Sequence, residues 1–281
     1  MKNPKKIKEC KRVIWNYYQS HKRMMPWCPS QLPLQKNRTL DTYAIFISEV
    51  MLQQTQVSRV MTKYPLFMKA FPSFETLAAA SLSDVLLIWQ GMGYNRRAKF
   101  LKSSAEMVIN RFDGILPDEA SLLEQLPGIG SATARSIVTF AYNKPELFIE
   151  TNIRRVIIHH FFSDSEAVDD RDIMPYIEQI IDKKNPREWY YALMDYGSLL
   201  AKEVTNPNRK SKHYIIQSKF EGSRRQIRGE ILKTLLSHGT IQKDMLLNIL
   251  SVEQTILDDI LDELVNEQMI DQKLSFYSIK K

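Results

Sequence analysis

Between Lys6 and about Gln217, the chain is a succession of helix-length segments whose apolar residues recur every three or four positions. Short turns containing Gly, Pro or Asn separate these segments, and no stretch alternates as a half-buried strand would. The clearest segments are YAIFISEVMLQQ, RVMTKYPLFMKAF, TLAAASLSDVLLIWQ, RAKFLKSSAEMVINRF, ARSIVTFAY and WYYALMDYGSLLAKEV. The pattern predicts an all-α body over about the first two hundred residues.

After the polar, basic stretch VTNPNRKSKHY the pattern changes. Three helical segments follow, with Gly239 ending the first of them, and then the β-like tail KLSFYSI. This is the layout of a winged-helix-like module. We therefore expect a body over 1–218, made of a six-helix module at about 35–145 and a lobe from the N-terminus and about 146–218, followed by a winged-helix-like module over 219–281.

The charge balance favours a polyanionic partner. The chain has 281 residues, of which 39 are Lys or Arg and 32 are Asp or Glu, giving a net charge of +7. Nucleic acid and an anionic membrane surface both fit that sign. The N-terminus lacks the apolar run of a secretion signal, and no segment approaches the roughly 18 apolar residues that a membrane span needs. We expect a soluble, intracellular protein without a membrane partner.

The cysteines and histidines predict no metal site. Cys10 and Cys28 are too few for a disulfide framework or a four-thiolate cluster. His159 and His160 are adjacent, so on a helix they face different sides. Packing or surface exposure is the expected role of all five histidines.

The stretch LPGIGSATARSIV, residues 126–138, predicts a turn between two helices. Gly128 and Gly130 allow the backbone to come close to a ligand, and the second helix begins near Ser131. The unpaired N–H groups and positive end of that helix can then hold a DNA phosphate. A helix C-cap followed by a new helix would explain the two glycines as well.

This hairpin resembles that of the helix-hairpin-helix (HhH-GPD) DNA glycosylase superfamily. In that superfamily a catalytic carboxylate follows about twenty residues after the hairpin. Within it, SEVMLQQTQV, MPW, GMGYNRRA and MDYG look like motifs of the MutY-like adenine glycosylase branch, in the family's order over about residues 10–200. The resemblance implies a two-lobed glycosylase body and base excision repair. The expected reaction is hydrolysis of the N-glycosidic bond of adenine opposite 8-oxoguanine or guanine.

Glu49 is the expected general acid. It lies in the otherwise apolar helical stretch IFISEVML, where an unpaired charge is expensive, so its pKa should tend upward. The resemblance makes Glu49 the residue that protonates the departing adenine. The alternative is a Glu49 side chain that points to solvent.

Glu150 is the expected stabiliser of the oxocarbenium-like sugar, as carboxylates are in other glycoside hydrolyses. It begins the helical segment TNIRRVIIHHFF, so a helix-capping role without chemistry is the alternative. The family usually has Asp here in a D-x-N pattern. Glu150 departs from it by one methylene, while Asn152 preserves the Asn. The resemblance therefore makes Asn152 the third expected residue of the catalytic site.

The resemblance also places DNA contacts on the chain. Gln54, with Gln53 beside it, resembles the residue that wedges into the duplex when the base leaves the stack, and Tyr94 resembles the aromatic that probes next to it. An exposed helix-end amide is the alternative for Gln54. Arg96, Arg97 and Lys99 form a basic cluster that suits phosphates or a solvated helix start. The hairpin contacts are expected from Leu126, Pro127, Gly128, Gly130, Ser131 and Thr133.

Two further departures narrow the expected activity. Ala132 stands where bifunctional relatives carry a Schiff-base Lys, which favours monofunctional hydrolysis over a lyase step. No cysteines follow MDYG, so we expect no iron–sulfur cluster and no other cofactor, apart from a monovalent cation that the hairpin could hold. The basic residues expected to replace the cluster's loop on DNA are Arg209, Lys210, Lys212 and His213.

The expected partner is double-stranded DNA that contains a mismatch or a damaged base, bound by a cytoplasmic, nucleoid-associated monomer. Two alternatives stay open at this point. The excised base could be a mismatched thymine, uracil or a modified base. The chain could instead be a noncatalytic DNA-binding relative in which the winged-helix-like module supplies specificity.

Overall fold

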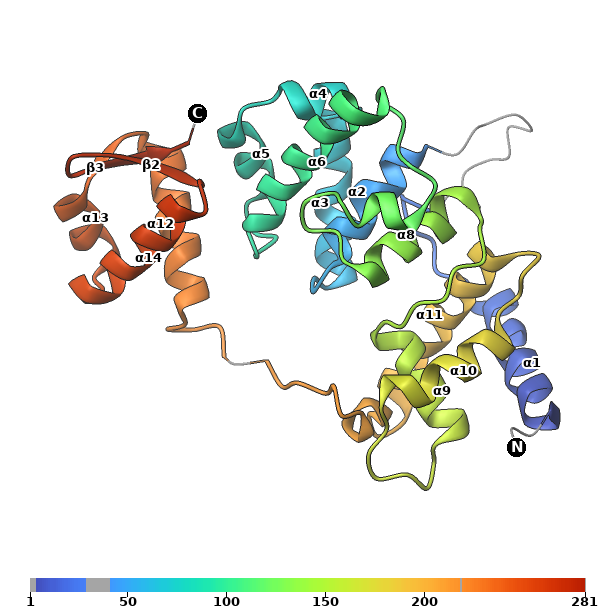
Figure 1. The fold of residues 1–281 in the computed structure, drawn as a ribbon. Helices are drawn as coiled ribbons and strands as arrows, with labels where there is room; N and C mark the ends of the chain where they lie inside the picture. Colours follow the sequence, from blue (N-terminus) through green and yellow to red (C-terminus); the bar gives the residue numbers. More distant parts are fainter. Residues whose placement is uncertain (1–3, 29–40, 218, 281) are drawn as a thin grey trace. The chain divides into compact units, whose positions relative to one another are not determined.

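The computed structural model describes residues 4–28, 41–217 and 219–280. They form two compact units that interleave along the sequence (Figure 1). Unit 1 comprises Met1–Phe46, Pro117–Gln125 and Ile129–Ile216, and unit 2 comprises Ile47–Leu116, Leu126–Gly128 and Gln217–Lys281. Helices dominate both units, which confirms the all-α prediction. The domain boundaries expected at about residue 35 and at residue 218 lie outside the described residues.

Unit 1 is helical and is built around one aromatic core. Trp189 and Tyr190 are fully buried, and the Tyr190 ring stacks on Phe148 with centroids 4.2 Å apart. Large buried rings of this kind contribute much of the apolar burial that stabilises a unit. The elements of unit 1 are α1 (Pro4–His21), α7 (Ala120–Leu123), α8 (Ser131–Tyr142), α9 (Thr151–Phe161), α10 (Asp170–Ile180), α11 (Pro186–Glu203) and the 3-10 helix η2 (Pro207–Lys210).

The first part of unit 2 follows the periodic segments closely, with one difference. Its helices are α3 (Val57–Ala70), α4 (Phe74–Ala79), α5 (Leu82–Trp89) and α6 (Arg96–Phe112), and α2 (Thr42–Leu52) runs across the division between the units. The segment TLAAASLSDVLLIWQ, expected as one helix, is divided between α4 and α5. Ser81 ends the continuity because its side chain caps α5, accepting a hydrogen bond from the Asp84 amide at 3.1 Å.

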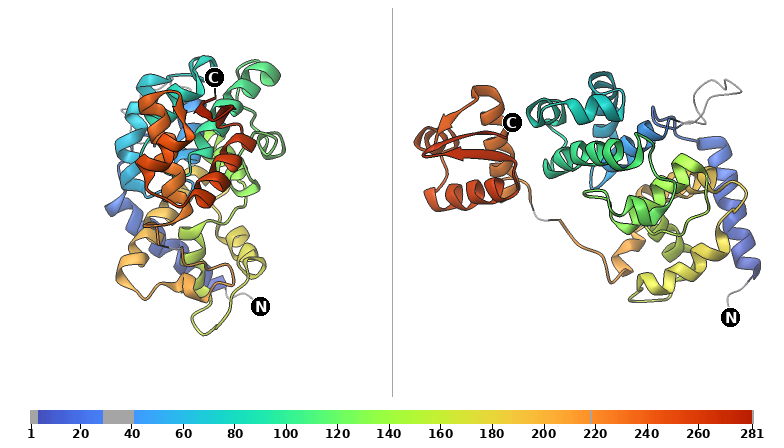
Figure 2. Two further views of the ribbon diagram at one scale, coloured as in Figure 1. Left: turned by 90° about the vertical axis from the view of Figure 1, so that its left-hand side faces the viewer. Right: turned by 45° about the horizontal axis from the view of Figure 1, so that its top comes forward.

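The C-terminal part of unit 2 is a small α/β module. It consists of α12 (Arg224–His238), β1 (Ile241–Gln242), α13 (Lys243–Leu250), α14 (Gln254–Asn266), β2 (Ile270–Lys273) and β3 (Phe276–Ile279). The strands form an antiparallel sheet in the order β1-β3-β2, drawn in dark orange and red in Figure 2. Gly239 ends α12 with φ +76°, as expected, and the element order is that of a winged-helix module.

Within the described ranges, no helix has both the length and the apolar character that crossing a membrane requires.

Candidate functional site

Glu49 lies on α2 and is half-buried, between the buried residues Ser48 and Val50. The apolar character of this helix places its side chains among buried neighbours rather than on a polar surface. Glu49 is therefore less exposed than a side chain that points entirely to solvent. The carboxyl group stays a candidate general acid.

Arg97 organises the end of α2, a role that the sequence analysis did not assign to it. Its side chain is buried, and its Nη1 donates to the carbonyl oxygens of Val50, Met51 and Gln53 at 2.9, 3.0 and 2.6 Å. The Nη2 atom donates to Thr55 Oγ1 at 2.8 Å. Arg97 is thus committed to capping the helix that carries Glu49, and the expectation that it contacts phosphate is wrong.

The same guanidinium holds a second turn, residues 91–95. Its Nη2 donates to the carbonyl oxygens of Met92 and Gly93 at 3.4 and 3.3 Å. The group also lies over the rings of Trp89 and Tyr94, 5.1 and 5.5 Å from their centroids. Burial lowers the pKa of Arg97 to about 10, which still leaves it charged at neutral pH.

Two predicted DNA-contacting residues have left-handed backbone conformations in these turns. Gln54 has φ +49° and Tyr94 has φ +47°, values that non-glycine residues rarely adopt. Gln54 is exposed and Tyr94 is 37% exposed. Strained residues of this kind persist where the surroundings fix them, and Arg97 binds groups next to both. Gln54 is thus an exposed residue just after the end of α2, a position that fits both the expected DNA contact and the helix-end alternative.

The first half of the hairpin, Leu126 to Gly128, is fixed within unit 2. Gly128 has φ +76°, and a Cβ there would lie 2.6 Å from Phe100 Cδ2, so only glycine fits. Ser104 Oγ donates to the Pro127 carbonyl at 3.1 Å. Gln53 Nε2 donates to the Gly128 carbonyl at 3.3 Å, which links the hairpin to the end of α2.

The second half of the hairpin opens α8 in unit 1. Gly130 is the N-cap residue and makes no side-chain cap, while Ser131 and Ala132 are exposed. Arg135 Nη1 donates to Ser131 Oγ, and the Thr133 carbonyl accepts from Ser136 Oγ at 2.9 Å. This exposed helix start, without a capping side chain, is suited to an anion.

Glu150 is the N-cap residue of α9, yet its side chain makes no capping hydrogen bond to the helix. The helix-capping alternative thus holds for the position of Glu150 but not for a capping hydrogen bond from its side chain. Burial raises the pKa of Glu150 to about 6, and the positive charges of Arg23, Arg154 and Arg155 act in the opposite direction. Glu150 is thus a carboxyl group at the start of α9 whose ionised form is disfavoured by burial and favoured by three arginines.

Asn152 lies where α9 and α11 cross closely. Arg155 Nη1 donates both to Asn152 Oδ1 at 2.7 Å and to the Gly197 carbonyl at 2.8 Å. A Cβ at Gly197 would lie 2.6 Å from the Asn152 carbonyl oxygen and 2.8 Å from the Asn152 Cβ. The glycine of MDYG is therefore what allows α11 to approach the start of α9.

The aspartate of MDYG has a separate role. Asp195 is buried, and it accepts from the Arg23 amide at 2.9 Å and from Arg23 Nε at 2.6 Å. The ion pair fixes one of the cations whose charge acts on Glu150. Sequence reasoning identified MDYG as a motif but missed these partners, because the pairing joins residues far apart in the chain.

The segment after α11 is tied to the start of α9. Asn208 is buried, and its Nδ2 donates to the Thr151 carbonyl at 3.0 Å. The Val168 amide donates to the Lys210 carbonyl at 2.7 Å, and the Lys212 amide donates to the Val168 carbonyl at 2.9 Å. Arg209 and Lys212 are exposed, whereas Lys210 is half-buried and its Nζ donates to the Ser163 carbonyl.

The thiols do not fit an iron–sulfur cluster. Cys10 and Cys28 are both free and buried, and two thiols cannot supply four thiolate ligands. In the part of the chain that the structure describes, no group of three or more His, Cys, Asp or Glu residues is placed to hold a metal ion. A monovalent cation at the hairpin stays a prediction.

The chain resembles known proteins in both sequence and fold. A family model described as HhH-GPD superfamily base excision DNA repair protein matches residues 47–183. The chain is 32% identical over 191 residues to the adenine DNA glycosylase of Buchnera aphidicola subsp. Baizongia pistaciae, a match that covers 67% of this chain and 52% of that protein. It is 30% identical over 257 residues to the adenine DNA glycosylase of Mycobacterium tuberculosis, with 83% and 79% covered.

The chain thus spans about half the length of the Buchnera relatives, 52% of each of two. Among solved structures, a thermostable thymine-DNA glycosylase aligns with a TM-score of 0.63 and 24% identity, covering 73% of this chain and 92% of that one. A non-covalent endonuclease III–DNA complex aligns with a TM-score of 0.58 and 18% identity, covering 73% and 90%. At these identities the structural matches establish the fold alone.

Proposed function

This chain belongs to the HhH-GPD superfamily of base excision DNA repair proteins, in its MutY-like branch, and we propose that it is an adenine DNA glycosylase. The proposed substrate is adenine mispaired with 8-oxoguanine or guanine in double-stranded DNA. The observation that carries the proposal is Glu150, a carboxyl group at the N-cap position of α9 whose side chain makes no capping hydrogen bond and whose charge is favoured by Arg23, Arg154 and Arg155. Curated relatives named adenine DNA glycosylase support the choice of base.

Glu49 and Glu150 have different roles in this proposal. Glu49 protonates the departing adenine, because a half-buried carboxyl group on an apolar helix suits a general acid. Glu150 stays ionised and stabilises the positive charge that develops on the sugar. Its pKa of about 6 leaves most of the group ionised at neutral pH. Water then completes the hydrolysis and leaves an abasic site.

The proposed reaction stops at hydrolysis. Ala132 is exposed in the first turn of α8, where bifunctional members of the superfamily carry an amine. Without that amine, no Schiff base forms there with the sugar, and β-elimination has no nucleophile at this position. The DNA strand is therefore expected to stay intact until alkali cleaves it at the abasic site.

DNA is held mainly through its phosphates in this proposal. The hairpin residues 126–133 offer backbone amides at the start of α8, and Arg209, Lys210 and Lys212 supply positive charge. Gln54 and Tyr94 occupy the strained turns that are proposed to enter the duplex when adenine leaves the stack. Such a site binds any duplex weakly and a mismatched duplex more tightly.

A panel of duplexes tests the proposal. Each duplex carries one candidate pair: adenine opposite 8-oxoguanine or guanine, thymine or uracil opposite guanine, or a modified base. Alkali after incubation reveals abasic sites, and Glu49→Gln and Glu150→Gln serve as inactive controls. Cleavage at adenine in the parent alone supports the proposal. Removal of another base with adenine untouched identifies a different glycosylase, and binding without turnover on any duplex identifies a noncatalytic DNA-binding protein.

A further inference from the structure

The C-terminal module, residues 219–280 of the described chain, has the wrong charge for a conventional DNA-reading domain. Residues 219–281 contain nine Lys and Arg against ten Asp and Glu, a net charge of −1, so residues 1–218 hold a net charge of +8. In helix-turn-helix proteins the second helix of the pair enters the major groove, the place that α14 occupies here. This helix has four carboxylates and no Lys or Arg, so phosphates would repel it.

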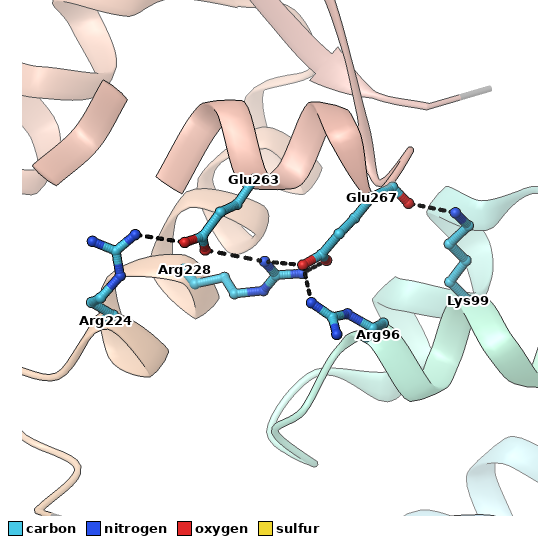
Figure 3. A network of polar contacts seen from close by, with 6 residues as sticks. All are labelled: Arg96, Lys99, Arg224, Arg228, Glu263 and Glu267. Atoms are coloured by element: carbon cyan, nitrogen blue, oxygen red, sulfur yellow. Dashed lines mark hydrogen bonds and ion pairs between the residues drawn. The ribbon is translucent and has the colours of Figure 1, made fainter. Parts of the chain in front are cut away.

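Three carboxylates of α14 and the residue directly after it pair with arginines: Asp259, Glu263 and Glu267. Figure 3 shows Glu267, directly after α14, between Arg228 of α12 and Arg96 of α6. The Glu267 and Arg228 side chains are each only 17% exposed. Lys99 Nζ donates to the Glu267 carbonyl oxygen, so a second cation of α6 contacts the same residue.

The negative charge of Glu267 is favourable at the N-terminus of α6. A helix N-terminus carries a partial positive charge and favours an acidic residue, yet the first turn of α6 has none and begins with Arg96 and Arg97. Glu267 supplies the missing negative charge from a segment 171 positions later in the chain. Arg96, which was expected to contact phosphate, is thereby engaged by the module in the structure described.

A second contact reaches the turn that precedes α6. Arg225 Nη1 of α12 donates to the Tyr94 hydroxyl oxygen at 3.3 Å, and Gln217 Nε2 donates to the same oxygen. Tyr94 is thus held from two sides, with Arg97 over its ring and the C-terminal segment on its hydroxyl group. The backbone of Tyr94 has a φ of +47°, a conformation that persists where surrounding contacts fix it.

We propose that the C-terminal module positions the Tyr94 turn, residues 91–95, and thereby affects which base pair the enzyme engages, with Glu267 and Arg225 as positioning residues. Glu267 fixes the module against α6, and Arg225 then orients the Tyr94 side chain through its hydroxyl group. The module acts on discrimination between duplexes and not through phosphate contacts of α14. This inference rests on the proposed glycosylase function and on the expected contact of Tyr94 with DNA.

The test uses the full chain with Glu267→Gln and Arg225→Gln, and Glu263→Gln as a matched control. Glu263 pairs with Arg224 and Arg228 inside the module and makes no ion pair with α6 in the structure described. The readout is the ratio of single-turnover rates for adenine opposite 8-oxoguanine and opposite guanine. We expect Glu267→Gln and Arg225→Gln to change this ratio about fivefold or more, a typical coupling, and Glu263→Gln to leave it within about twofold.

Two further measurements separate positioning from loss of structure. Hydrogen exchange of residues 91–96 should be faster in Glu267→Gln and Arg225→Gln than in the control. In a Tyr94→Phe background, Arg225→Gln should have no additional effect on the ratio, because the accepting hydroxyl group is gone. Parent-like ratios in both variants would overturn the proposal, as would a full additional effect in the Tyr94→Phe background.

A failure of the proposed function is distinguishable from a failure of this inference. If the parent excises no base from any duplex, the glycosylase proposal fails. The ratio of dissociation constants for mismatched and fully paired duplexes then replaces the ratio of rates. Glu267→Gln and Arg225→Gln should still change that ratio while Glu263→Gln does not, and an unchanged ratio would overturn the inference.

Discussion

Glu150 combines two opposing influences on one carboxyl group. Burial disfavours its charge, while Arg23, Arg154 and Arg155 favour it, and burial has the larger effect on its pKa. Two of these arginines are committed elsewhere, Arg23 to Asp195 and Arg154 to Asp170, at 2.6 Å each. The positive charges of Arg23 and Arg154 that favour ionised Glu150 are therefore shared with Asp195 and Asp170.

The pKa of Glu150 predicts the acidic limb of the pH profile. The folded-state pKa is raised to about 6, so the carboxyl group is mostly protonated below that pH and mostly ionised above it. The single-turnover rate should rise about tenfold per pH unit below pH 6 and level off above it, because only the anion stabilises the sugar cation. Glu150→Gln should lose on the order of 10²-fold or more in rate at pH 7.5.

The control for this profile is DNA affinity, measured across the same pH range with Glu150→Gln. The role of Glu150 in stabilising the sugar cation would be contradicted if the single-turnover rate changed with pH only as DNA affinity does. A Glu150→Gln variant with the parent's rate would also contradict it.

Arg97→Lys should damage both stability and catalysis while retaining the charge. An ammonium group cannot reproduce the six donations that the planar guanidinium makes to the end of α2 and the Tyr94 turn. We expect a loss of about 3 kcal/mol in unfolding free energy and of about tenfold or more in kcat/KM. Chemical denaturation and steady-state kinetics measure the two effects.

Arg111→Lys is the matched control, since Arg111 is an exposed arginine on the same helix. It should change the unfolding free energy by less than about 0.5 kcal/mol. Equal losses of unfolding free energy in the two variants would show that the buried contacts of Arg97 do not stabilise the chain.

The candidate residues could be predicted from the sequence only where a local pattern marks them. Glu49 and Glu150 were found because each follows an apolar segment within a recognisable motif. Arg97 was misassigned because it lies in a basic run whose other members are half-buried or exposed. Nothing local distinguishes the one arginine whose partners lie 42 to 47 positions earlier in the chain. Long-range partners of this kind are fixed by tertiary packing.

At the scale of elements, the crossing of α9 and α11 positions Asn152. Gly197→Ala should force the helices apart, because the new Cβ would lie 2.6 Å from the Asn152 carbonyl oxygen. We expect a loss of about 1–3 kcal/mol in stability and a lower excision rate. Thermal unfolding and single-turnover kinetics measure these changes.

Gly229→Ala, in α12, is the matched control. A Cβ there meets nothing within 4 Å, and the residue lies inside a helix. This substitution should therefore stabilise the chain by about 0.5–1 kcal/mol. Equal losses of stability in Gly197→Ala and Gly229→Ala would show that the close approach of α9 and α11 does not require a glycine at position 197.

Helix periodicity predicted most of the helices. It did not predict a helix boundary that is set by a side-chain cap. The segments that became α2, α3, α6, α8 and α11 were each expected as a helix. The division between α4 and α5 depends on one hydrogen bond from the Asp84 amide to the Ser81 hydroxyl group, and β1 is only two residues long. Features this small leave no periodic pattern to detect.

At the scale of the whole molecule, positive charge is concentrated outside the C-terminal module. Neutralising Arg209, Lys210 and Lys212 to Gln should reduce the salt dependence of DNA binding by about 0.9 in log–log slope for each phosphate that the variant no longer neutralises. Affinities measured over a series of salt concentrations give the slope. Replacing the exposed Lys183 and Lys184 by Gln is the control. An unchanged slope in the triple variant would exclude these residues from phosphate binding.

The release of free adenine from a duplex with one adenine opposite 8-oxoguanine is the most direct test of the central claim. In a single-turnover experiment, chromatography should detect free adenine released at the rate at which alkali-sensitive sites appear. The strand should stay intact before alkali, borohydride should trap no covalent complex, and Glu49→Gln should release none. Absence of adenine release by the parent chain, or release equally fast from Glu49→Gln, would contradict the assignment of this chain as an adenine glycosylase with Glu49 as its acid.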